Sequence, residues 1–316
     1  MASINKFGKE VRLEIADSTG VVVFNTSGLR VDFEVKIIPG YNRAKFVIYN
    51  LNPKTIKEIS NGNRFVRLYV KLHDRDEQQF NYDFYVNNSV TVKKVPDSLT
   101  ELYCIGTIRK NFTSKNIALR IPQPSLRRYC KALATAAKQD IKFTFTDFPP
   151  EIINYIPPNP NAVWSGEVLK ALEKLGRAYS FTVNEEAGNV LNLIYLPKAE
   201  NQKQSGQNTR SPYLLKTINM RSNPRIGIAK IEIESNLDLN IRAGTILDTS
   251  QLITASAGDT FDYLTQVANQ IVSPTSGNSR FSTLTVDHRG SNYTSEWTTS
   301  AMAVKATSGT RTPTII

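Results

Sequence analysis

The sequence contains few of the residues from which most enzyme active sites are built. Only two cysteines, Cys104 and Cys130, and two histidines, His73 and His288, occur among 316 residues. Two cysteines cannot form a disulfide framework and do not have the spacing of a four-ligand zinc site, so we expect two buried or half-buried thiols in a reducing compartment. The scarcity of histidine argues against metalloenzyme and triad chemistry. We therefore expect no cofactor and no bound metal.

Long apolar runs and nucleotide-binding motifs are also missing. No stretch approaches the roughly 18 apolar residues that a membrane-spanning helix requires, and residues 1–8 have no apolar core of the secretory type. Glycine-rich phosphate loops and a G-x-S-x-G serine motif do not occur. The composition, with 40% hydrophobic and 21% charged residues, is that of an ordinary folded chain. We expect a soluble protein that is made in the cytoplasm and does not contact membranes.

The remaining candidate catalytic groups are more simply interpreted as structural or surface residues. His73 lies in a charged stretch between two expected strands, and His288 ends another strand, where Asp287 would point to the opposite face. Glu185 and Glu186 fall in an expected hairpin loop and are expected to be solvated. Paired acids can hydrolyse glycosidic bonds, so a cell-wall-degrading enzyme that uses Glu185 and Glu186, or His288, is the alternative to a structural protein without enzymatic activity.

The positive charge is distributed over the chain. Residues 1–110 carry 17 basic and 12 acidic side chains, residues 111–210 carry 13 and 8, and residues 211–316 carry 9 and 8. The excesses of +5, +5 and +1 make up the net charge of +11. Such a distribution permits contact with phosphates without requiring it, so a basic nucleic-acid-binding protein is a second alternative.

The first third of the chain has the two-residue period of β-strands. Residues 31–37 alternate so that Val31, Phe33, Val35 and Ile37 share one face, and residues 44–49 are the expected hairpin partner. A short helix should follow, with Asn52 as its N-cap, Pro53 at its first position, and Ile56 and Ile59 on its apolar side. Further strands are expected at 11–15, 64–72, 79–86, 89–94 and 100–108, and residues 21–24 should form a short buried run.

The middle third changes to a helical period. Ser125 can cap a helix over 125–137 whose apolar stripe consists of Leu126, Tyr129, Cys130, Leu133 and Ala137. A strand at 141–145, a proline-rich connector and a second helix at 165–178 follow, and then a hairpin at 179–184 and 190–196. Residues 201–210 form a polar linker. The last third returns to strands at 214–220, 226–234, 245–247, 280–286 and 297–304, with a helical stretch at 263–271 and a loose tail from 307.

These patterns predict a β-rich α+β protein. Two barrel-like β domains, residues 1–110 and 211–316, should flank a small α/β module at 111–210. The two β domains resemble each other faintly, because residues 44–52 and 229–238 share an Ala-Lys-hydrophobic-x-Ile pattern. In this repeat, Phe46 and Ile48 correspond to Ile231 and Ile233, and both pairs should lie on inward faces of matching strands.

The strand, turn, strand and short helix over residues 31–68 resemble the opening domain of bacteriophage baseplate hub proteins, the tail-tip hubs of contractile-tailed phages of the Mu-like and T4-like kinds. The family's I-x-N-L-S/N-x-x-T element matches Ile48, Asn50, Leu51 and Thr55. In the last third, Leu237 and Gly244 resemble the family's second barrel. His288, together with residues 296–299, resembles its closing strands.

The resemblance implies a homotrimer whose two β domains per chain make six similar units around a channel. Such a ring would join a sixfold tail tube protein to a threefold central spike protein in the virion, contact other baseplate proteins and admit passing contact with phage DNA. Ring closure would cover strand edges and bury aromatic side chains such as Tyr69, Tyr103 and Trp297. The positive charge would then lie on the outer surface that faces partners.

Overall fold

The computed structural model describes residues 9–60, 62–72, 77–113, 115–122, 124–137, 140–146, 148–156, 161–186, 189–195, 212–222, 224–226, 230–250, 252, 280–305 and 314–315. His73, Ala229, the connector residues 157–160, the linker 201–210, the helical stretch 263–271 and most of the tail lie outside the described residues.

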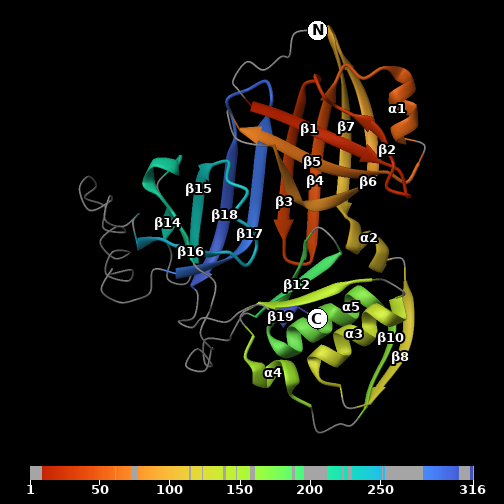
Figure 1. The fold of residues 1–316 in the computed structure, drawn as a ribbon, viewed down its shortest axis with the longest axis vertical. Coiled ribbons are helices and arrows are strands. Elements are labelled where there is room, and N and C mark those ends of the chain that lie inside the picture. Colours follow the sequence, from red (N-terminus) through yellow and green to blue (C-terminus); the bar gives the residue numbers. More distant parts are fainter. Residues whose placement is uncertain are drawn as a thin grey trace.

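One large sheet contains the strands of both the first and the last third of the chain (Figure 1). Its main path runs β14-β15-β18-β17-β3-β4-β7-β6-β5-β1-β2, while β13 and β16 pair beside β17. Helix α1 (Pro53–Ser60) connects β4 to β5, and a short 3-10 turn, η2, spans Thr217–Asn219. The strands are β1 (Lys9–Ala16), β2 (Val22–Asn25), β3 (Val31–Ile38), β4 (Tyr41–Tyr49), β5 (Phe65–Leu72), β6 (Gln78–Lys94), β7 (Asp97–Gly106), β13 (Tyr213–Leu214), β14 (Arg225–Ile226), β15 (Lys230–Asn236), β16 (Ile246–Asp248), β17 (Arg280–Ser291) and β18 (Thr298–Lys305).

The expectation of two separate barrel-like β domains is wrong, because the strands of both belong to one sheet. Strand β17 pairs antiparallel with β3 over six residues, from Val286 opposite Ile37 to Ser291 opposite Asp32. This pairing joins the two predicted β domains edge to edge, and the described residues contain no closed barrel. Strand alternation predicts which face of a strand is buried but not which strand lies beside it, so the sequence pattern could not reveal this junction.

The buried faces of this sheet form one hydrophobic cluster. The predicted inward face of β3, from Val31 to Ile37, is buried, and so are Ile231 and Ile233 of β15 and Val286 of β17. Other strand predictions need correction. Residues 79–86 and 89–94 form the single strand β6 with a bulge near Asn88, and the predicted buried run at 21–24 includes the exposed Val21 and Val22.

The middle third forms a separate layer below the large sheet in the view of Figure 1, with a hydrophobic cluster of its own. The predicted helix at 125–137 is confirmed as α3, and Ser125 Oγ accepts a hydrogen bond from the Arg128 N–H at 3.3 Å. Strands β8, β10 and β19 and helices α2 and α4 were not predicted, and the expected helix at 165–178 begins only at Val168, because residues 165–167 belong to β10. The elements are α2 (Thr107–Thr113), β8 (Asn116–Pro122), α3 (Leu126–Ala137), β9 (Lys142–Thr146), α4 (Pro150–Asn154), β10 (Asn161–Glu167), α5 (Val168–Tyr179), β11 (Phe181–Glu186), β12 (Val190–Tyr195) and β19 (Thr314–Ile315).

Glu185 fastens this middle module to the large sheet, contrary to the expectation of a solvated loop acid. It lies on strand β11, and its side-chain carboxylate accepts hydrogen bonds from the N–H groups of Ile108 at 2.6 Å and Arg109 at 3.4 Å, at the start of α2. Its backbone carbonyl accepts a bond from Asn42 Nδ2 at 2.7 Å, at the tip of the β3–β4 hairpin. A side chain at Gly106 would collide with the carboxylate, which explains the glycine at that position.

Burial raises the pKa of Glu185 to about 7, because desolvation outweighs the hydrogen bonds that favour the ionised form. Nearby Asp83 raises this pKa further. In the unfolded chain the group titrates near 4.5, so folding takes up a proton between these two values. The stability associated with protonated Glu185 is therefore complete below about pH 4.5 and is lost as the pH rises through about 7.

We expect Glu185→Gln to remove this pH dependence, since glutamine stays neutral. Relative to the variant, the wild-type chain should lose about 3 kcal/mol of unfolding free energy between pH 4.5 and 7.5, from a pKa difference of about 2.5. Chemical denaturation of both chains across this range measures the difference. The comparison with the variant matters because buried His288 contributes a slope of the opposite sign. Parallel curves for the two chains would contradict the assignment.

Candidate subunit and partner interfaces

The hub-like motif Ile48–Thr55 forms the bend between β4 and α1. Asn50 has a positive φ of 57°, a left-handed conformation that asparagine tolerates better than most residues. Its side chain donates a hydrogen bond to Asp97 Oδ1 and accepts one from the Ser98 N–H, both at 2.9 Å. Leu51 is buried beneath this bend, and Thr55 is buried in the first turns of α1. The motif thus fixes the β6–β7 hairpin to the end of β4.

The predicted N-cap of α1 is confirmed. Asn52 Oδ1 accepts a hydrogen bond from the Thr55 N–H at 2.8 Å, and Pro53 begins the helix. Ile59 is buried, while Ile56 is partly buried against the same core. The motif therefore combines a left-handed bend with a capped helix, and no group in it is arranged for catalysis.

His288 is also part of the structure of the sheet. It lies within β17, three residues before the end of the strand, and its buried ring pairs with Thr299 Oγ1 of β18 at 2.9 Å. Burial, with a smaller effect of Arg242, lowers the pKa of His288 to about 3, so the ring stays neutral at physiological pH. Thr299 Oγ1 also accepts the Asp238 N–H at 2.9 Å, next to buried Leu237. His288 connects β17 and β18 to the turn after β15.

Gly244 lies where the middle module touches the last third of the chain. It has a positive φ of 81°, and a β-carbon there would come within 3.1 Å of Ile194 on β12. Asn192, on the same strand, would be the next neighbour. The glycine of the second hub-like segment therefore permits the close approach of two parts of the fold.

The three aromatic residues expected at subunit interfaces lie in different environments. Tyr103 of β7 is 40% exposed, and its hydroxyl is bound to Glu101. Tyr69 of β5 is partly buried between strands and donates a hydrogen bond to Glu14 at 2.9 Å. Trp297 is only 2% exposed, because it packs edge-on against Phe33 with ring centroids 6.0 Å apart. Its own chain already covers Trp297, so Tyr103 retains the largest area for a partner.

The solvent face of the large sheet is a lattice of opposite charges arranged by strand register. Arg289 of β17 lies opposite Glu34 of β3 and pairs with it at 3.1 Å, and Lys36 lies opposite Asp287 at 3.7 Å. On the next strands Lys45 pairs with Glu101 at 2.9 Å. The charged residues on this face of β3, β4, β7, β14, β15 and β17 are balanced: Lys36, Arg43, Lys45, Arg225, Lys230 and Arg289 against Asp32, Glu34, Glu101, Glu232, Glu234 and Asp287.

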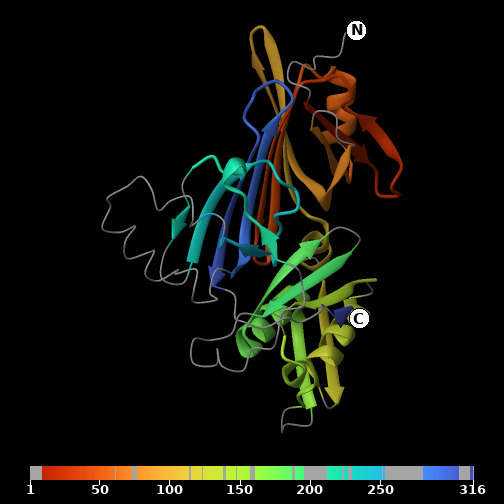
Figure 2. The same cartoon turned by 60° about the vertical axis from the view of Figure 1, so that its left-hand side comes forward.

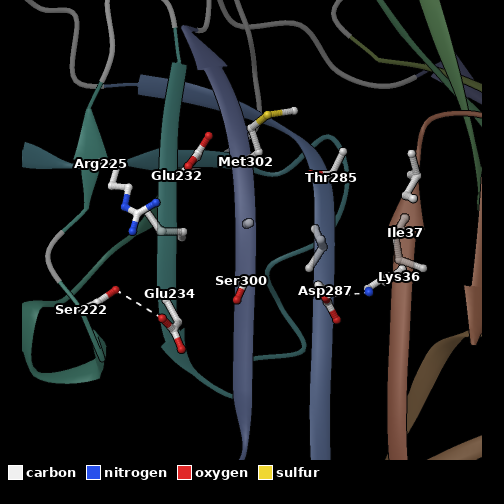
Figure 3. Close-up of a pocket in the computed structure, with 14 residues that line it drawn as sticks. Lys36, Ile37, Ser222, Arg225, Glu232, Glu234, Thr285, Asp287, Ser300 and Met302 are labelled. Atoms are coloured by element: carbon white, nitrogen blue, oxygen red, sulfur yellow. Dashed lines mark hydrogen bonds and ion pairs between the residues drawn. The ribbon is translucent and has the colours of Figure 1, made fainter. Parts of the chain in front are cut away.

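This face is hollowed in two places. The larger hollow, of about 500 Å³, crosses β14, β15, β18, β17 and β3. Figure 3 shows Ser300 and Thr285 on its floor, with Arg225 and Glu232 on one side and Lys36 on the other. The second hollow, of about 380 Å³, continues across β4 and β7 and shares Lys36. The larger hollow combines small polar side chains with charges of both signs. The second is lined by Lys36, Arg43, Lys45 and Glu34, together with two tyrosines and apolar side chains.

Apolar side chains are exposed at two edges of the sheet. Strand β2 ends the main path, and its neighbour Val21 is 62% exposed, with Val22 and Val23 also exposed. The tip of the β6–β7 hairpin extends beyond the rest of the sheet (Figure 2) and carries exposed Val90 and Val92, while Val95 is 98% exposed. Residues 18–29, around β2, contain no charged side chain that would protect the edge.

Both cysteines are buried free thiols, as expected, and burial raises the pKa of each. Among the described residues, no cluster of three histidine, cysteine or acidic side chains could hold a metal ion. Within the same residues, every helix is too short or too polar to cross a membrane.

The fold of the chain is similar to that of phage tail proteins over nearly its whole length. A tail protein from Neisseria meningitidis MC58 has 8% identity and a TM-score of 0.56, over 93% of this chain and 96% of that one. The 43 kDa tail protein of prophage MuSo2 from Shewanella oneidensis has 7% identity and a TM-score of 0.55, over 94% and 98%. No protein-family model matches the sequence, and no curated protein matches it in sequence.

The chain therefore has the fold of these phage tail proteins. The likeness of fold extends to a component of a secretion system. An E. coli component of the type VI secretion system, described as structurally similar to the T4 tail proteins gp27 and gp5, matches with 8% identity and a TM-score of 0.54, over 90% of this chain and 76% of that one. The expected resemblance to phage tail hub proteins is thus confirmed at the level of the fold, whereas one continuous sheet stands in place of the two expected barrel-like domains.

Replacement of Asn50 tests the structural role of the hub-like motif. Asn50→Ala should lower the free energy of unfolding by about 2–3 kcal/mol, because it adds left-handed strain and removes two hydrogen bonds. Asn50→Gly should cost less, because glycine adopts this conformation without strain. Urea denaturation of both variants measures the difference. Equal losses for alanine and glycine would show that the left-handed bend does not determine the choice of residue.

Proposed function

We propose that this chain is a structural hub of a phage tail baseplate or of a related injection machine. The observation that carries the proposal is the likeness of fold to phage tail proteins across more than nine-tenths of the chain. In this proposal three copies form a ring around a channel. The ring joins the sixfold tail tube above to the threefold central spike below, and other baseplate proteins bind around it.

The pairing of β3 with β17 supports a ring built from similar units. It joins the edge strand of one half of the sheet to the edge strand of the other half within a single chain. In a ring of three chains, equivalent pairings between subunits would extend the sheet around the channel. The burial of the two repeated segments agrees with a ring of similar units. Phe46 and Ile48 of the first segment are buried, and so are the corresponding Ile231 and Ile233 of the second. Superposition of the two halves is the remaining test of their equivalence.

The exposed apolar edges favour an assembly over an isolated monomer. Exposed β-branched side chains on an unprotected edge strand invite pairing with another chain, and natural proteins usually protect such edges with charges or proline. The valines at β2 have no charged residue or proline beside them. At the tip of the β6–β7 hairpin, Lys93, Lys94 and Pro96 give only the turn such protection, and Val90 and Val92 stay exposed. In the proposed ring, neighbouring copies or the adjoining tail proteins cover them.

The balanced charges of the solvent face of the sheet suit the lining of a DNA channel. A strongly basic lining would bind phosphates along the whole passage, whereas paired charges leave little net attraction. The proposal therefore allows passing contact with DNA without retention. It also places the excess positive charge elsewhere on the molecule.

The two rival functions find less support in the geometry. Glu185 is buried beneath the start of α2, and Glu186 Oε1 accepts a hydrogen bond from Asn192 Nδ2 at 3.0 Å, so the two acids do not form an open catalytic pair. His288 is buried and neutral. Zymography on peptidoglycan tests the wall-degrading alternative, and salt-dependent retention on DNA tests the nucleic-acid-binding alternative.

We expect the purified chain to sediment as a trimer, alone or together with its spike partner. The double variant Val90→Lys, Val92→Lys should shift it towards monomer, because two charges on the hairpin disfavour burial of this surface. Sedimentation velocity at micromolar concentration measures the change.

The matched control is Val163→Lys, which adds a charge at an exposed valine of the middle module. It should leave the sedimentation coefficient unchanged. A stable monomer of the wild-type chain, both with and without the spike partner, would refute the ring.

A further inference from the structure

Much of the net positive charge of the chain lies in one segment. This segment crosses the boundary between the first and the middle third, so the net charges of the thirds do not reveal it. Between Glu101 and Asp140 there is no acidic residue, whereas eight lysines and arginines occur. This segment includes α2, β8 and α3 of the middle module. The molecule thus carries an acid-free region of about one-eighth of its length, which begins in β7 and continues through the first part of the middle module.

Two neighbouring helices of the middle module display these cations and others to solvent. Arg127, Arg128 and Lys131 lie on the exposed side of α3, opposite the buried stripe that contains Leu133. The exposed side of α5 carries Lys170, Lys174 and Arg177. Both helices contribute to the same hydrophobic cluster and contact each other, as Figure 1 shows. We call these six residues the cationic face.

Most cations of the cationic face have no carboxylate partner among the residues that the structure describes. On the solvent face of the sheet, Lys36, Lys45, Lys230 and Arg289 each pair with a carboxylate, whereas Arg43 and Arg225 pair with none of the described carboxylates. On the cationic face, Lys170 pairs with Glu167 at 3.1 Å. Within the described part of the chain, the other five residues have no ion-pair partner. Glu173 is exposed on α5 between Lys170 and Arg177, so the six cations stand against two carboxylates, Glu167 and Glu173, and the face keeps an excess of positive charge.

We propose that the cationic face is a docking surface for a carboxylate-rich face of another protein, in particular an acidic helix. Lys170, Lys174 and Arg177 are spaced four and three residues apart, so they form a stripe about 10 Å long. Glutamates with the same spacing on a partner helix would form a matching row. Such charge complementarity governs the rate and specificity of association more than its strength.

Other anionic partners fit the cationic face less well. Single-stranded nucleic acid requires a row of exposed aromatic rings for stacking. Tyr129 of α3 is buried and Tyr179 of α5 is half-buried, so Tyr155, which follows α4, is the exposed tyrosine beside these helices. A membrane surface requires large apolar side chains beside the cations, whereas the exposed side of α3 otherwise presents Thr135 and alanines. A stripe of about 10 Å spans only about three base pairs of duplex DNA, too few for a stable phosphate track.

The test uses the full chain and a fluorescent helical peptide of about 20 residues, with alanine as its background and glutamate at every fourth position. Fluorescence anisotropy should detect binding at about 20 mM salt that weakens at about 150 mM salt. Two triple variants should each weaken binding about tenfold or more. The first changes the cations of α3 (Arg127→Glu, Arg128→Glu, Lys131→Glu), and the second changes those of α5 (Lys170→Glu, Lys174→Glu, Arg177→Glu). Circular dichroism and sedimentation verify that the variants keep the fold and assembly state of the wild-type chain.

The control variant, Lys54→Glu, Lys57→Glu, Lys216→Glu, makes the same change in net charge at exposed lysines elsewhere. It should alter peptide binding less than twofold, because a local surface rather than total charge attracts the peptide. Equal weakening by the control, or absence of binding at low salt, would overturn the proposal. Retention of a duplex of about 20 base pairs through the same six residues at about 150 mM salt would assign the face to DNA instead. None of these outcomes depends on whether the chain forms a trimeric ring.

Discussion

The backbone pairing between β3 and β17 is the interaction on which the rest of this structure depends. It combines strands from the first and last thirds of the chain into one sheet and allows one hydrophobic core to serve both. The same register aligns the charged rows on the opposite face, since Glu34 meets Arg289 and Lys36 meets Asp287 only when Val35 faces His288. A shift by one residue would reverse both faces at once. The buried core and the balanced solvent face are therefore two results of one register.

The contacts that attach the middle module to the large sheet are of a second kind. They are polar, in contrast to the apolar contacts of the core. Glu185, Asn42 and the start of α2 meet through hydrogen bonds, and glycines at 106 and 244 allow the backbones to approach. Buried polar contacts of this kind define orientation well but contribute little net stability. The module can thus hold a defined position relative to the sheet while its own hydrophobic cluster provides most of its stability.

Local features of the fold could be predicted from the sequence, whereas relations between distant segments could not. The alternation of β3 and the apolar stripe of α3 correctly identified buried residues, because these patterns depend on the geometry of one element. The same reasoning placed Glu185 in a loop, since a Glu-Glu pair before Ala-Gly is typical of a turn. The burial of Glu185 depends on α2, whose residue Ile108 is 77 positions away in the sequence. The acid-free segment between Glu101 and Asp140 is evident in the sequence itself, although the net charge of each third of the chain does not reveal it.

The insertion of the middle module within the large sheet has a consequence for how the chain folds during synthesis. Strand β3 leaves the ribosome long before β17, and the whole middle module is made in between. Contacts between segments so far apart in sequence form slowly, because the intervening chain must first be closed into a loop. Because the module has its own core, it can fold first and shorten that loop by bringing its two ends together. Until β17 arrives, the edge of β3 is open, and this nascent intermediate is the stage at which premature association between copies is most readily nucleated.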